Sequence, residues 1–173
     1  MAHRYRFELA RSPRNIQAYY ALRETIFCHE QKLFEGSDID EIDAAAYPIV
    51  ALQTDSPLLA LPSVVGVVRI YETAPRQWYG GRLGVHFDYR RVGRIGKGLI
   101  VKAVTTANAW GCDRFLATVQ TQNVRFFRRL HWRSLESLSI QGQPHHLMEA
   151  DLAAYPPCIE SRFDPPGCAV LAS

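Results

Sequence analysis

The chain has 173 residues, which suits one domain and is long enough for a sizeable hydrophobic core. Hydrophobic residues make up 47% and charged residues 21%, a balance typical of a folded globular protein rather than a disordered chain. The formal net charge of +3 is by itself too small to indicate a nucleic-acid-binding protein.

The sequence shows no pattern typical of secretion, membrane insertion or a metal centre. The first six residues lack the apolar core of a secretory signal, and no apolar run is long enough to cross a bilayer. The four cysteines form no CxxC pair and no metal-ligand spacing with histidine. We therefore expect a cytoplasmic protein with free thiols, no metal, and no membrane or nucleic-acid partner.

Hydrophobic periodicity predicts the elements of the amino-terminal half. Tyr5, Phe7 and Leu9 alternate in a strand, and Ser12-Pro13 begins a helix that extends to about His29. The acidic stretch over 35–43 that follows predicts a loop and a short second helix. The remaining expected elements are strands over 47–53, 63–71 and 82–87, with a turn over 77–81.

The carboxyl-terminal half begins with an amphipathic helix whose apolar stripe runs from Ile95 to Ala107 and which Gly111 ends. The order β-α-α-β-β-β-α-β-α-β-β predicts a mixed sheet in an α+β domain. We expect one domain over 1–153 and a proline-containing tail over 154–173, extended or partly disordered. The other expected elements are a strand over 115–119, a helix over 122–130, and closing strands over 135–141 and 145–150.

The segment between the expected fourth strand and the amphipathic helix has the composition of a phosphate-binding turn. Glycines let the backbone approach a ligand, a helix start offers unpaired N–H groups, and basic side chains add positive charge. The alternative is a tight strand-to-helix turn that holds no ligand. A second basic cluster follows at Arg125, Arg128 and Arg129, where a solvated helix face is the alternative to an anion site.

This turn, together with the segment from Asn123 to Trp132, resembles the acyl-CoA core of the GNAT superfamily of N-acetyltransferases. The resemblance covers about residues 5–152. It implies that family's fold, a mostly antiparallel central sheet of about seven strands with helices on both faces. The first helix, with Arg23, Phe27 and Glu30-Gln31, resembles a subset of these enzymes. The span 92–132 is similar to the bacterial nitrogen-starvation acetyltransferase branch.

The resemblance implies acetyl-CoA as co-substrate, with its pyrophosphate on the turn motif Arg/Gln-x-x-Gly-x-Gly/Ala. Two registers fit, one starting at Arg90 and one at Arg91, and each departs from the motif at one position. The aromatic pair in the second helix is a coenzyme contact or plain core. The implied contacts are Val85, His86, Phe87, Arg90, Arg91, Val92, Gly93, Arg94, Ile95, Gly96, Lys97, Gly98, Asn123, Phe126 and Phe127.

The proton chemistry of the family is altered in this chain. Phe127 stands where the family usually has a tyrosine that protonates the departing thiolate, and phenylalanine has no proton to give. His131 is a candidate substitute, and a turn histidine is the alternative. The resemblance places the oxyanion contact on the backbone N–H of Val85 or Phe87. His86 is a candidate general base, although strand alternation turns it away from the face of its neighbours.

The acceptor side is expected to be acidic. Glu30, a candidate catalytic group, and the carboxylates Asp40, Glu41 and Asp43 lie near the loop that borders the acceptor in this family, where they could hold a cationic amine. A solvated acidic loop with helix-capping duties is the alternative. His145 or His146 could also line the acceptor cleft, but adjacent strand residues point oppositely, so only one can do so.

These features favour an N-acetyltransferase that transfers the acetyl group of acetyl-CoA to a small-molecule amine by direct attack in a ternary complex. A longer-chain N-acyltransferase of the autoinducer-synthase type is one alternative. A non-catalytic acyl-CoA-binding sensor or subunit is another, which the missing tyrosine and the imperfect glycine motif support. A nucleic-acid-binding domain is more distant, since the basic clusters lack a recognised motif. A homodimer is possible.

Overall fold

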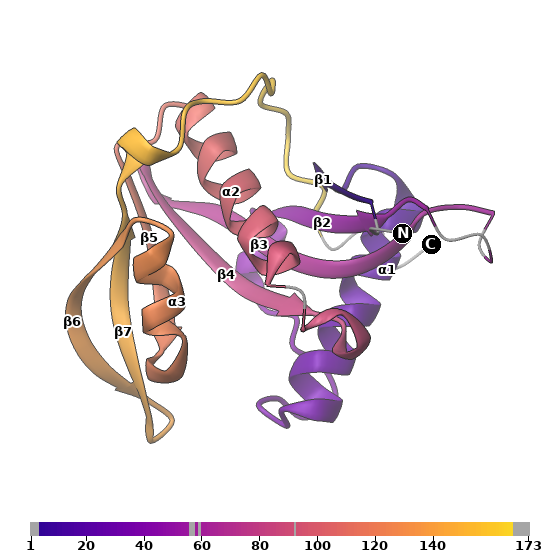
Figure 1. The fold of residues 1–173 in the computed structure, drawn as a ribbon, viewed down its shortest axis with the longest axis horizontal. Helices are drawn as coiled ribbons and strands as arrows, with labels where there is room; N and C mark the ends of the chain where they lie inside the picture. The colour runs from indigo at the N-terminus through magenta and orange to yellow at the C-terminus, as the bar shows by residue number, and fades with distance from the viewer. Residues whose placement is uncertain (1–3, 56–57, 59, 92, 168–173) are drawn as a thin grey trace.

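Seven strands form one sheet in the order β1-β2-β3-β4-β5-β7-β6 (Figure 1). The computed structural model describes residues 4–55, 58, 60–91 and 93–167. Every neighbouring pair is antiparallel except β4 and β5, which are parallel, so the expected α+β fold is confirmed. The strands are β1 (Tyr5–Leu9), β2 (Tyr47–Gln53), β3 (Ser63–Ala74), β4 (Gln77–Val85), β5 (Arg114–Gln120), β6 (Trp132–Ile140) and β7 (Gln143–Ala150).

Helices cover both faces of the sheet, with α1 (Pro13–Arg23) on one face and α2 (Arg94–Ala109) on the other (Figure 1). The short helix α3 (Val124–Arg129) follows β5 and precedes β6. Ser12 caps α1 as its side chain accepts a hydrogen bond from the N–H of Asn15 at 3.2 Å. None of the described helices is long and apolar enough to span a membrane.

Alternation along β2 explains the two hydrophobic cores. Ile49 and Ala51 belong to the core that α2 covers, whereas Val50 and Leu52 belong to the core beneath α1. All four side chains are at most 1% exposed. The strand is therefore buried on both faces, which explains its almost continuous apolar sequence.

Several expected boundaries differ from the structure. The first helix does not stay α-helical to His29, because Glu24–Glu30 forms a π-helix, η1, and the second is only the 3₁₀ turn η2 (Glu41–Ala44). The turn expected over 77–81 is wrong, since Trp78 is fully buried in β4 between strands β3 and β5. The fourth strand ends at Val85, and the 3₁₀ turn η3 (Phe87–Tyr89) follows it.

The sheet opens between β4 and β5. The two strands pair only at Gln77–Tyr79 with Arg114–Leu116, after which β5 continues alongside β7. The register between Arg69–Gly81 and Val67–Gly84 leaves Arg82 and Leu83 opposite one residue of β3, which is a β-bulge in β4. Beyond Tyr79, β4 therefore no longer pairs with β5 on one side, and its pairing with β3 on the other side is interrupted by the bulge.

The described part of the tail, residues 154–167, is an extended segment that packs against α2 (Figure 1). The N–H of Cys158 donates to the carbonyl oxygen of Thr105 at 3.3 Å, and the indole N–H of Trp110 donates to that of Glu160 at 2.9 Å. Tyr155 is buried, and its hydroxyl donates to the carbonyl oxygen of Leu130. These contacts attach the tail along the carboxyl-terminal half of the helix.

Candidate functional site

A cavity of about 520 Å³ lies where β4 and β5 separate. The bulged part of β4 forms one wall, β5 and α3 form the opposite wall, and α2 residues close it on one side. The segment after η1 adds Leu33 and Phe34. Its polar and aromatic lining residues include Gln31, Arg69, Tyr71, Tyr79, Arg82, Asn123, Phe127 and His145.

The α3 side of the cavity carries two of the expected coenzyme contacts, Asn123 and Phe127. Phe127 is 7% exposed and packs edge-on against Trp132, with ring centroids 5.1 Å apart. Its ring therefore belongs to the core and to the cavity wall together. Phe126 packs against Phe127 but does not line the cavity, and its ring lies near Gly96 at the start of α2.

The basic turn leads directly into the first turn of α2. Gly93 is the N-cap, with no side-chain cap, and its carbonyl oxygen accepts from the N–H of Lys97 at 3.2 Å. The first N–H groups of the helix precede this bond and point out of its end, where an anion is favoured. A Cβ on Gly96 would lie 3.7 Å from the Phe126 ring, so the helix start and α3 adjoin.

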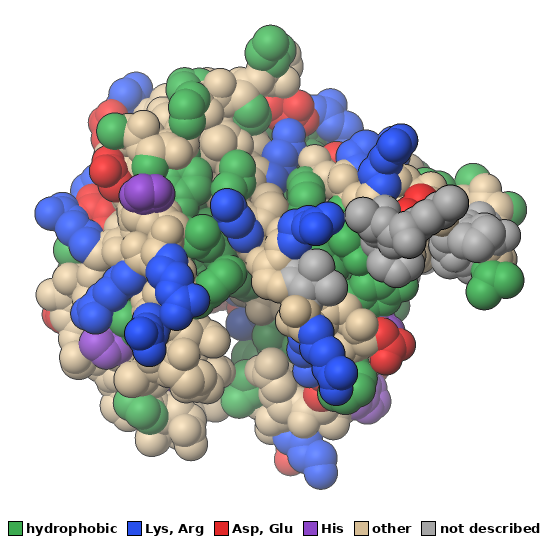
Figure 2. Space-filling model, viewed as in Figure 1, with side chains coloured by type: hydrophobic (Ala, Val, Ile, Leu, Met, Phe, Trp, Pro, Cys, Tyr) green, Lys and Arg blue, Asp and Glu red, His purple; other side chains and the backbone are tan. Residues whose placement is uncertain are grey.

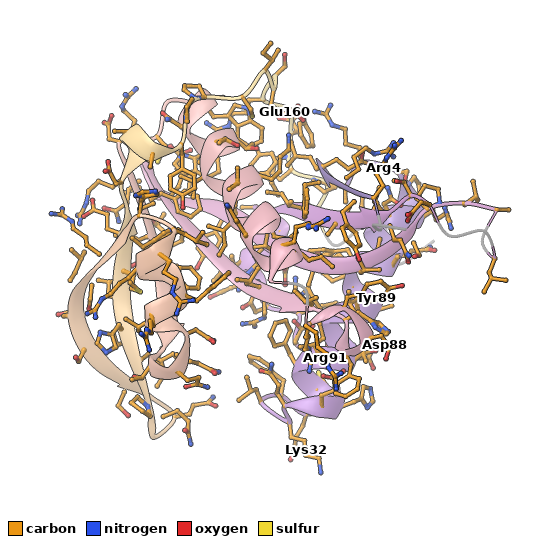
Figure 3. The ribbon with its side chains drawn as sticks, in the orientation of Figure 1. Arg4, Lys32, Asp88, Tyr89, Arg91 and Glu160 are labelled. Atoms are coloured by element: carbon orange, nitrogen blue, oxygen red, sulfur yellow. The ribbon has the colours of Figure 1, made fainter. Side chains whose placement is uncertain are left out.

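Basic side chains flank this junction. Figure 2 shows Lys and Arg gathered over α3 and around the turn before α2, with a hollowed strip of hydrophobic surface between them. Figure 3 places Arg91 beside η3, near Asp88 and Tyr89. The exposed basic residues of the two segments are Arg90, Arg91, Arg94, Lys97, Arg125, Arg128 and Arg129.

Not every residue of the turn motif faces that junction. Ile95 is 1% exposed and belongs to the α2 core, and Gly98 packs so closely on Phe7 that a Cβ would lie within 2.1 Å of its ring. Gly96 is thus the motif glycine beside α3, which fits the register that starts at Arg91. Val92 lies outside the described residues.

Glu30 and Arg90 are bound to each other. The Arg90 guanidinium donates to the Glu30 carboxylate and, through Nε, to the carbonyl oxygen of Val85 at 2.8 Å. Neither Glu30 nor Arg90 lines the cavity. Glu30, expected as a candidate catalytic group, thus links η1 to the turn before α2 and lies outside the cavity.

His86 and Phe87 lie past the end of β4 and do not line the cavity. The Nδ1 of His86 accepts a hydrogen bond from the backbone N–H of Asp88 at 3.3 Å. The backbone N–H of His86 donates to the carbonyl oxygen of Val65 at 2.8 Å. Phe87 is 69% exposed. Val85, the last residue of β4, does not line the cavity either. Near this end of β4, the residues that line the cavity are Arg82 and Leu83 of the bulge.

His131 is a turn residue. It follows α3 with a φ of +66°, and its N–H donates to the carbonyl oxygen of Arg128 at 3.2 Å. It borders a separate surface depression with Asp151 rather than the cavity. The positive φ, which glycine adopts most readily, reverses the chain from α3 into β6 at His131.

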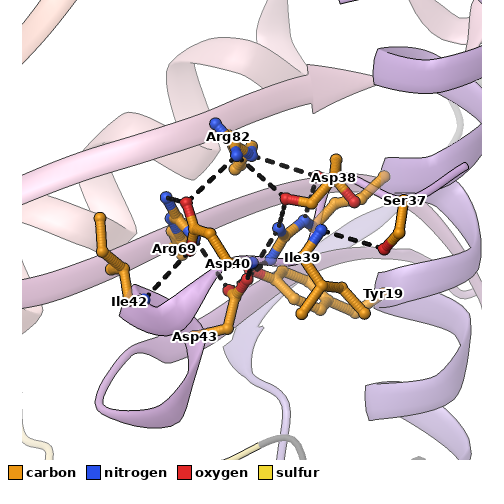
Figure 4. Close-up of polar contacts among 10 residues, drawn as sticks. Tyr19, Ser37, Asp38, Ile39, Asp40, Ile42, Asp43, Arg69 and Arg82 are labelled. Carbon is orange, nitrogen blue, oxygen red and sulfur yellow. Dashed lines mark hydrogen bonds and ion pairs between the residues drawn. The ribbon is translucent and has the colours of Figure 1, made fainter. Parts of the chain in front are cut away.

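A network of three arginines and three aspartates lies at the side of the cavity lined by Arg69 and Arg82 (Figure 4). The fully buried Arg23 donates to Asp38 at 2.7 Å and to Asp43 at 2.6 Å. Arg69 donates to both oxygens of Asp40, at 2.6 and 2.9 Å. Of the carboxylates expected at an acceptor site, Asp40 and Asp43 bind arginines, while Glu41 is exposed in η2, and none of the three lines the cavity.

The network shifts the pKa values of its members. Burial alone would raise the pKa of Asp43, but hydrogen bonds from Arg23 and the positive charges nearby outweigh it and lower that pKa. The pKa of Asp40 is lowered in the same way, by Arg69. Both carboxylates are therefore held ionised, with their charge compensated inside the protein.

The sequence reasoning missed Arg69 and Arg82, which line the cavity. A signal was present, because Arg69 interrupts the apolar strand Val67-Val68-Arg69-Ile70, and buried arginines are almost always paired. The matching aspartates stand close together in sequence, after the first helix.

His145 lines the cavity, whereas the neighbouring His146 binds the Ser134 hydroxyl, at 2.7 Å, and does not line it. Tyr71 and Tyr79 also line it and stack with ring centroids 6.0 Å apart. Burial raises the pKa of Tyr71. In the described part of the chain, no cluster of His, Cys, Asp and Glu is arranged to hold a metal ion.

Solved structures share the fold. A protein from Lactobacillus plantarum, described as a candidate N-acetyltransferase, superposes with a TM-score of 0.73 and 23% identity, over 86% of this chain and 98% of its own. An acyl-CoA N-acyltransferase from Pseudomonas aeruginosa gives 0.69 and 17%, over 87% and 100%. The CoA-dependent acyl-homoserine lactone synthase BjaI, solved with SAM and isopentyl-CoA, gives 0.64 and 18%, over 91% and 90%.

At these identities the structural similarities establish the fold alone. No curated protein sequence matches the chain significantly. The model of the acetyltransferase (GNAT) family matches residues 14–132, which is more than half of the chain. The match includes the bulged β4, α2 and α3, which line the cavity, together with α1 and the basic turn. The chain therefore belongs to the acetyltransferase (GNAT) family.

Proposed function

We propose that this protein transfers the acetyl group of acetyl-CoA to the amine of a small molecule. Members of the family are acyl-CoA-dependent N-acyltransferases. The observation that carries the proposal is the cavity between the separated strands β4 and β5, which adjoins a basic helix start on the α2 side. A thioester arm can enter between the strands while the phosphates remain at the surface.

The reaction requires positioning more than covalent help. The amine nitrogen, unprotonated, attacks the thioester carbonyl carbon, the C–S bond breaks and an amide forms. The proton that the nitrogen loses ends on the departing thiolate, directly or through water. An oxyanion develops on the carbonyl oxygen, so a nearby N–H donor accelerates the step.

The coenzyme side uses the surface around the start of α2. The N–H groups that follow Gly93, which no described side chain caps, and the exposed Arg91, Arg94 and Lys97 suit a pyrophosphate. The second basic cluster, on α3, suits a further phosphate. For the oxyanion we propose backbone N–H groups of β4 between Gly81 and Leu83, which line the cavity, in place of those of Val85 or Phe87.

The acceptor side supplies the proton chemistry. Phe127 offers no hydroxyl, and among the described lining residues His145 is the only imidazole. Imidazole titrates near neutral pH, which suits a general base for an amine. We assign this role to His145 rather than to Glu30, His86 or His131, which lie outside the cavity.

Thiol release from acetyl-CoA in the presence of an amine panel tests the proposal, with thermal shift as the readout of binding. We expect Gly96→Asp to remove the shift caused by acetyl-CoA, because it places bulk and negative charge beside the phosphates. Ser137→Asp adds the same charge to an exposed position of β6 and should leave the shift intact. Binding without thiol release for any amine would contradict the transferase and support a binding module.

A longer-chain acyl donor is the second candidate. It rests on the similarity in fold to the acyl-homoserine lactone synthase BjaI and on the apolar surface of the cavity. Thiol release should be measured for a series from acetyl-CoA to octanoyl-CoA at a fixed amine concentration. A kcat/KM that falls with chain length supports acetyl transfer, and one that rises supports the longer-chain donor.

A further inference from the structure

Resting on the proposed function, we propose that the acceptor amine carries a carboxylate, which binds Arg69 and Arg82 beside Phe27 and Phe34. The acceptor class is then amino acids, or amines with a carboxylate of similar placement. This reverses the expectation of a cationic acceptor held by carboxylates.

Arg69 has one donor left unused. Its side chain is 4% exposed, and its Nη1 and Nη2 atoms donate to Asp40, while Nη1 also lies 3.0 Å from Asp43. Its Nε is buried and has no hydrogen-bond partner. A buried, unpaired donor on a charged group is costly, so a ligand that accepts from it gains binding energy.

Gly81 keeps the approach to that donor open. A Cβ on Gly81 would lie 3.6 Å from the Nε of Arg69, in the space a ligand atom would use to reach it. Gly81 and Arg69 both line the cavity and pair across β3 and β4. The unpaired Nε thus adjoins the cavity through the gap left by a missing side chain.

Arg82 offers a second donor at the same end. It has a φ of +53° at the bulge and lies over the Phe34 ring, with its guanidinium carbon 4.3 Å from the ring centroid. Its Nε and Nη2 donate to Asp38 at 3.1 and 2.9 Å. Among the described residues no partner binds its Nη1. Burial, followed by the charges of Arg69 and Arg23, lowers its pKa.

The charge of the cavity wall selects an anion. Arg69 and Arg82 are its only charged lining residues, and no Asp or Glu of the described chain lines it. A carboxylate has two oxygens, which match one free donor from each arginine. The adjoining apolar side chains of Phe27, Leu33 and Phe34 suit an apolar substituent on the acceptor.

The test compares each carboxylate with its neutral analogue. Thiol release is measured at saturating acetyl-CoA for L-leucine and L-phenylalanine, their carboxamides, and the dication cadaverine. We expect kcat/KM to be at least about tenfold higher for the carboxylates than for the carboxamides, because one charge-assisted hydrogen bond contributes about that factor to affinity. Arg82→Gln should reduce this ratio toward one, mainly by raising KM for the carboxylates.

Arg76→Gln is the matched control. Arg76 also has a positive φ, next to β4, and also pairs with an aspartate, Asp113, but it is exposed and outside the cavity. The control should keep the ratio of the unaltered protein. Because Arg82 also holds Asp38, Gly81→Ala serves as a second variant. It blocks the Nε of Arg69 without removing an ion pair and should raise KM for the carboxylates.

The outcomes separate this inference from the proposed function. Acetylation of the carboxamides or cadaverine as efficiently as of the carboxylates would overturn the inference and leave the transferase standing. If no amine releases thiol, the transferase fails. Calorimetric titration of the CoA-saturated protein with L-leucine and leucinamide then decides the inference. Binding of L-leucine alone, lost in Arg82→Gln, supports it, and equal or absent binding overturns it.

Discussion

The ring of Phe7 lies 2.1–2.5 Å from the position that a Cβ atom on Gly98 would occupy. Phe7 belongs to β1 and Gly98 to α2, so the strand and the helix meet where the glycine has no side chain. One glycine of the basic motif thus serves packing, whereas Gly96, two residues earlier, faces α3. Substitutions at the two glycines are therefore expected to have different effects on stability.

We expect Gly98→Ala to destabilise the fold by about 1–3 kcal/mol, because the added methyl group overlaps the Phe7 ring. Gly96→Ala is the matched control in the same helix. Its Cβ would stand at an ordinary 3.7 Å from Phe126, and alanine favours the helix by up to about 1 kcal/mol. Urea denaturation measures both. Equal stability of the two variants would contradict the close packing of α2 on β1.

His145→Gln should lower kcat by about 10²–10⁴-fold if His145 is the general base, and should remove the acid limb of the pH–rate profile. His146→Gln is the control, since His146 binds Ser134 outside the cavity. Steady-state kinetics between about pH 5.5 and about pH 9 measure both variants, a range of about one unit or more on each side of the ordinary imidazole pKa of about 6.5. An unchanged profile in His145→Gln would exclude the assigned role.

Glu30→Gln should retain kcat within a few-fold, because the Glu30 carboxylate is bound by Arg90 and lies outside the cavity. The pair is part-exposed, so its loss should cost less than about 1 kcal/mol of stability. Parallel kinetics and thermal denaturation check the two statements. A loss of kcat as large as that expected for His145→Gln would show that Glu30 reaches the reacting atoms.

The arginine–aspartate network should make stability depend on pH in acid. The pKa of Asp43 is lower in the folded protein than its ordinary value of 3.8, so its stabilisation is fully present above that value. It is lost progressively as the pH falls from 3.8 through the lower folded pKa. The free energy of unfolding should therefore fall with pH below 3.8, as denaturation at a series of pH values would measure.

Asp43→Asn should reduce that acid dependence and destabilise the protein by about 3–5 kcal/mol at neutral pH, because it leaves the buried Arg23 with an uncompensated charge. Asp113→Asn removes the partner of the exposed Arg76 and should change stability little. Comparable losses of stability in the two variants would contradict a larger contribution of the buried network to the free energy of unfolding.

Arg128→Gln and Arg91→Gln should each raise KM for acetyl-CoA several-fold, and more at low than at high ionic strength, because exposed charges are screened by salt. Arg133→Gln is the control, since Arg133 pairs with Glu149 outside the cavity. KM measured at two salt concentrations separates the groups. An effect confined to kcat would place the basic clusters away from the coenzyme.

The order of the elements could be predicted from the sequence because short-range patterns set it. The stripe from Ile95 to Ala107 predicts α2, and alternation predicts β1. The resemblance of the basic turn and of the segment after Asn123 to the GNAT core was equally local, and the family match confirms it. The turn expected over 77–81 is wrong because this segment is part of β4, where Trp78 is buried and pairs with Phe115, distant in sequence.

The candidate site depended on contacts that no local pattern contains. The sequence suggested Asp40 as a ligand for a cationic acceptor, whereas in the structure its carboxylate is bound by Arg69, 29 positions away. Glu30 likewise meets Arg90 across 60 positions. Such pairings follow from the folding of the whole sheet.

The sequence by itself thus determined the fold class and the family, because hydrophobic period, helix caps and glycine spacing act over a few residues. Only the tertiary structure decided which charges face the cavity. The bulge at Arg82 and the separation of β4 from β5 open the cavity, and they turn guanidinium groups into it while the aspartates stay behind them.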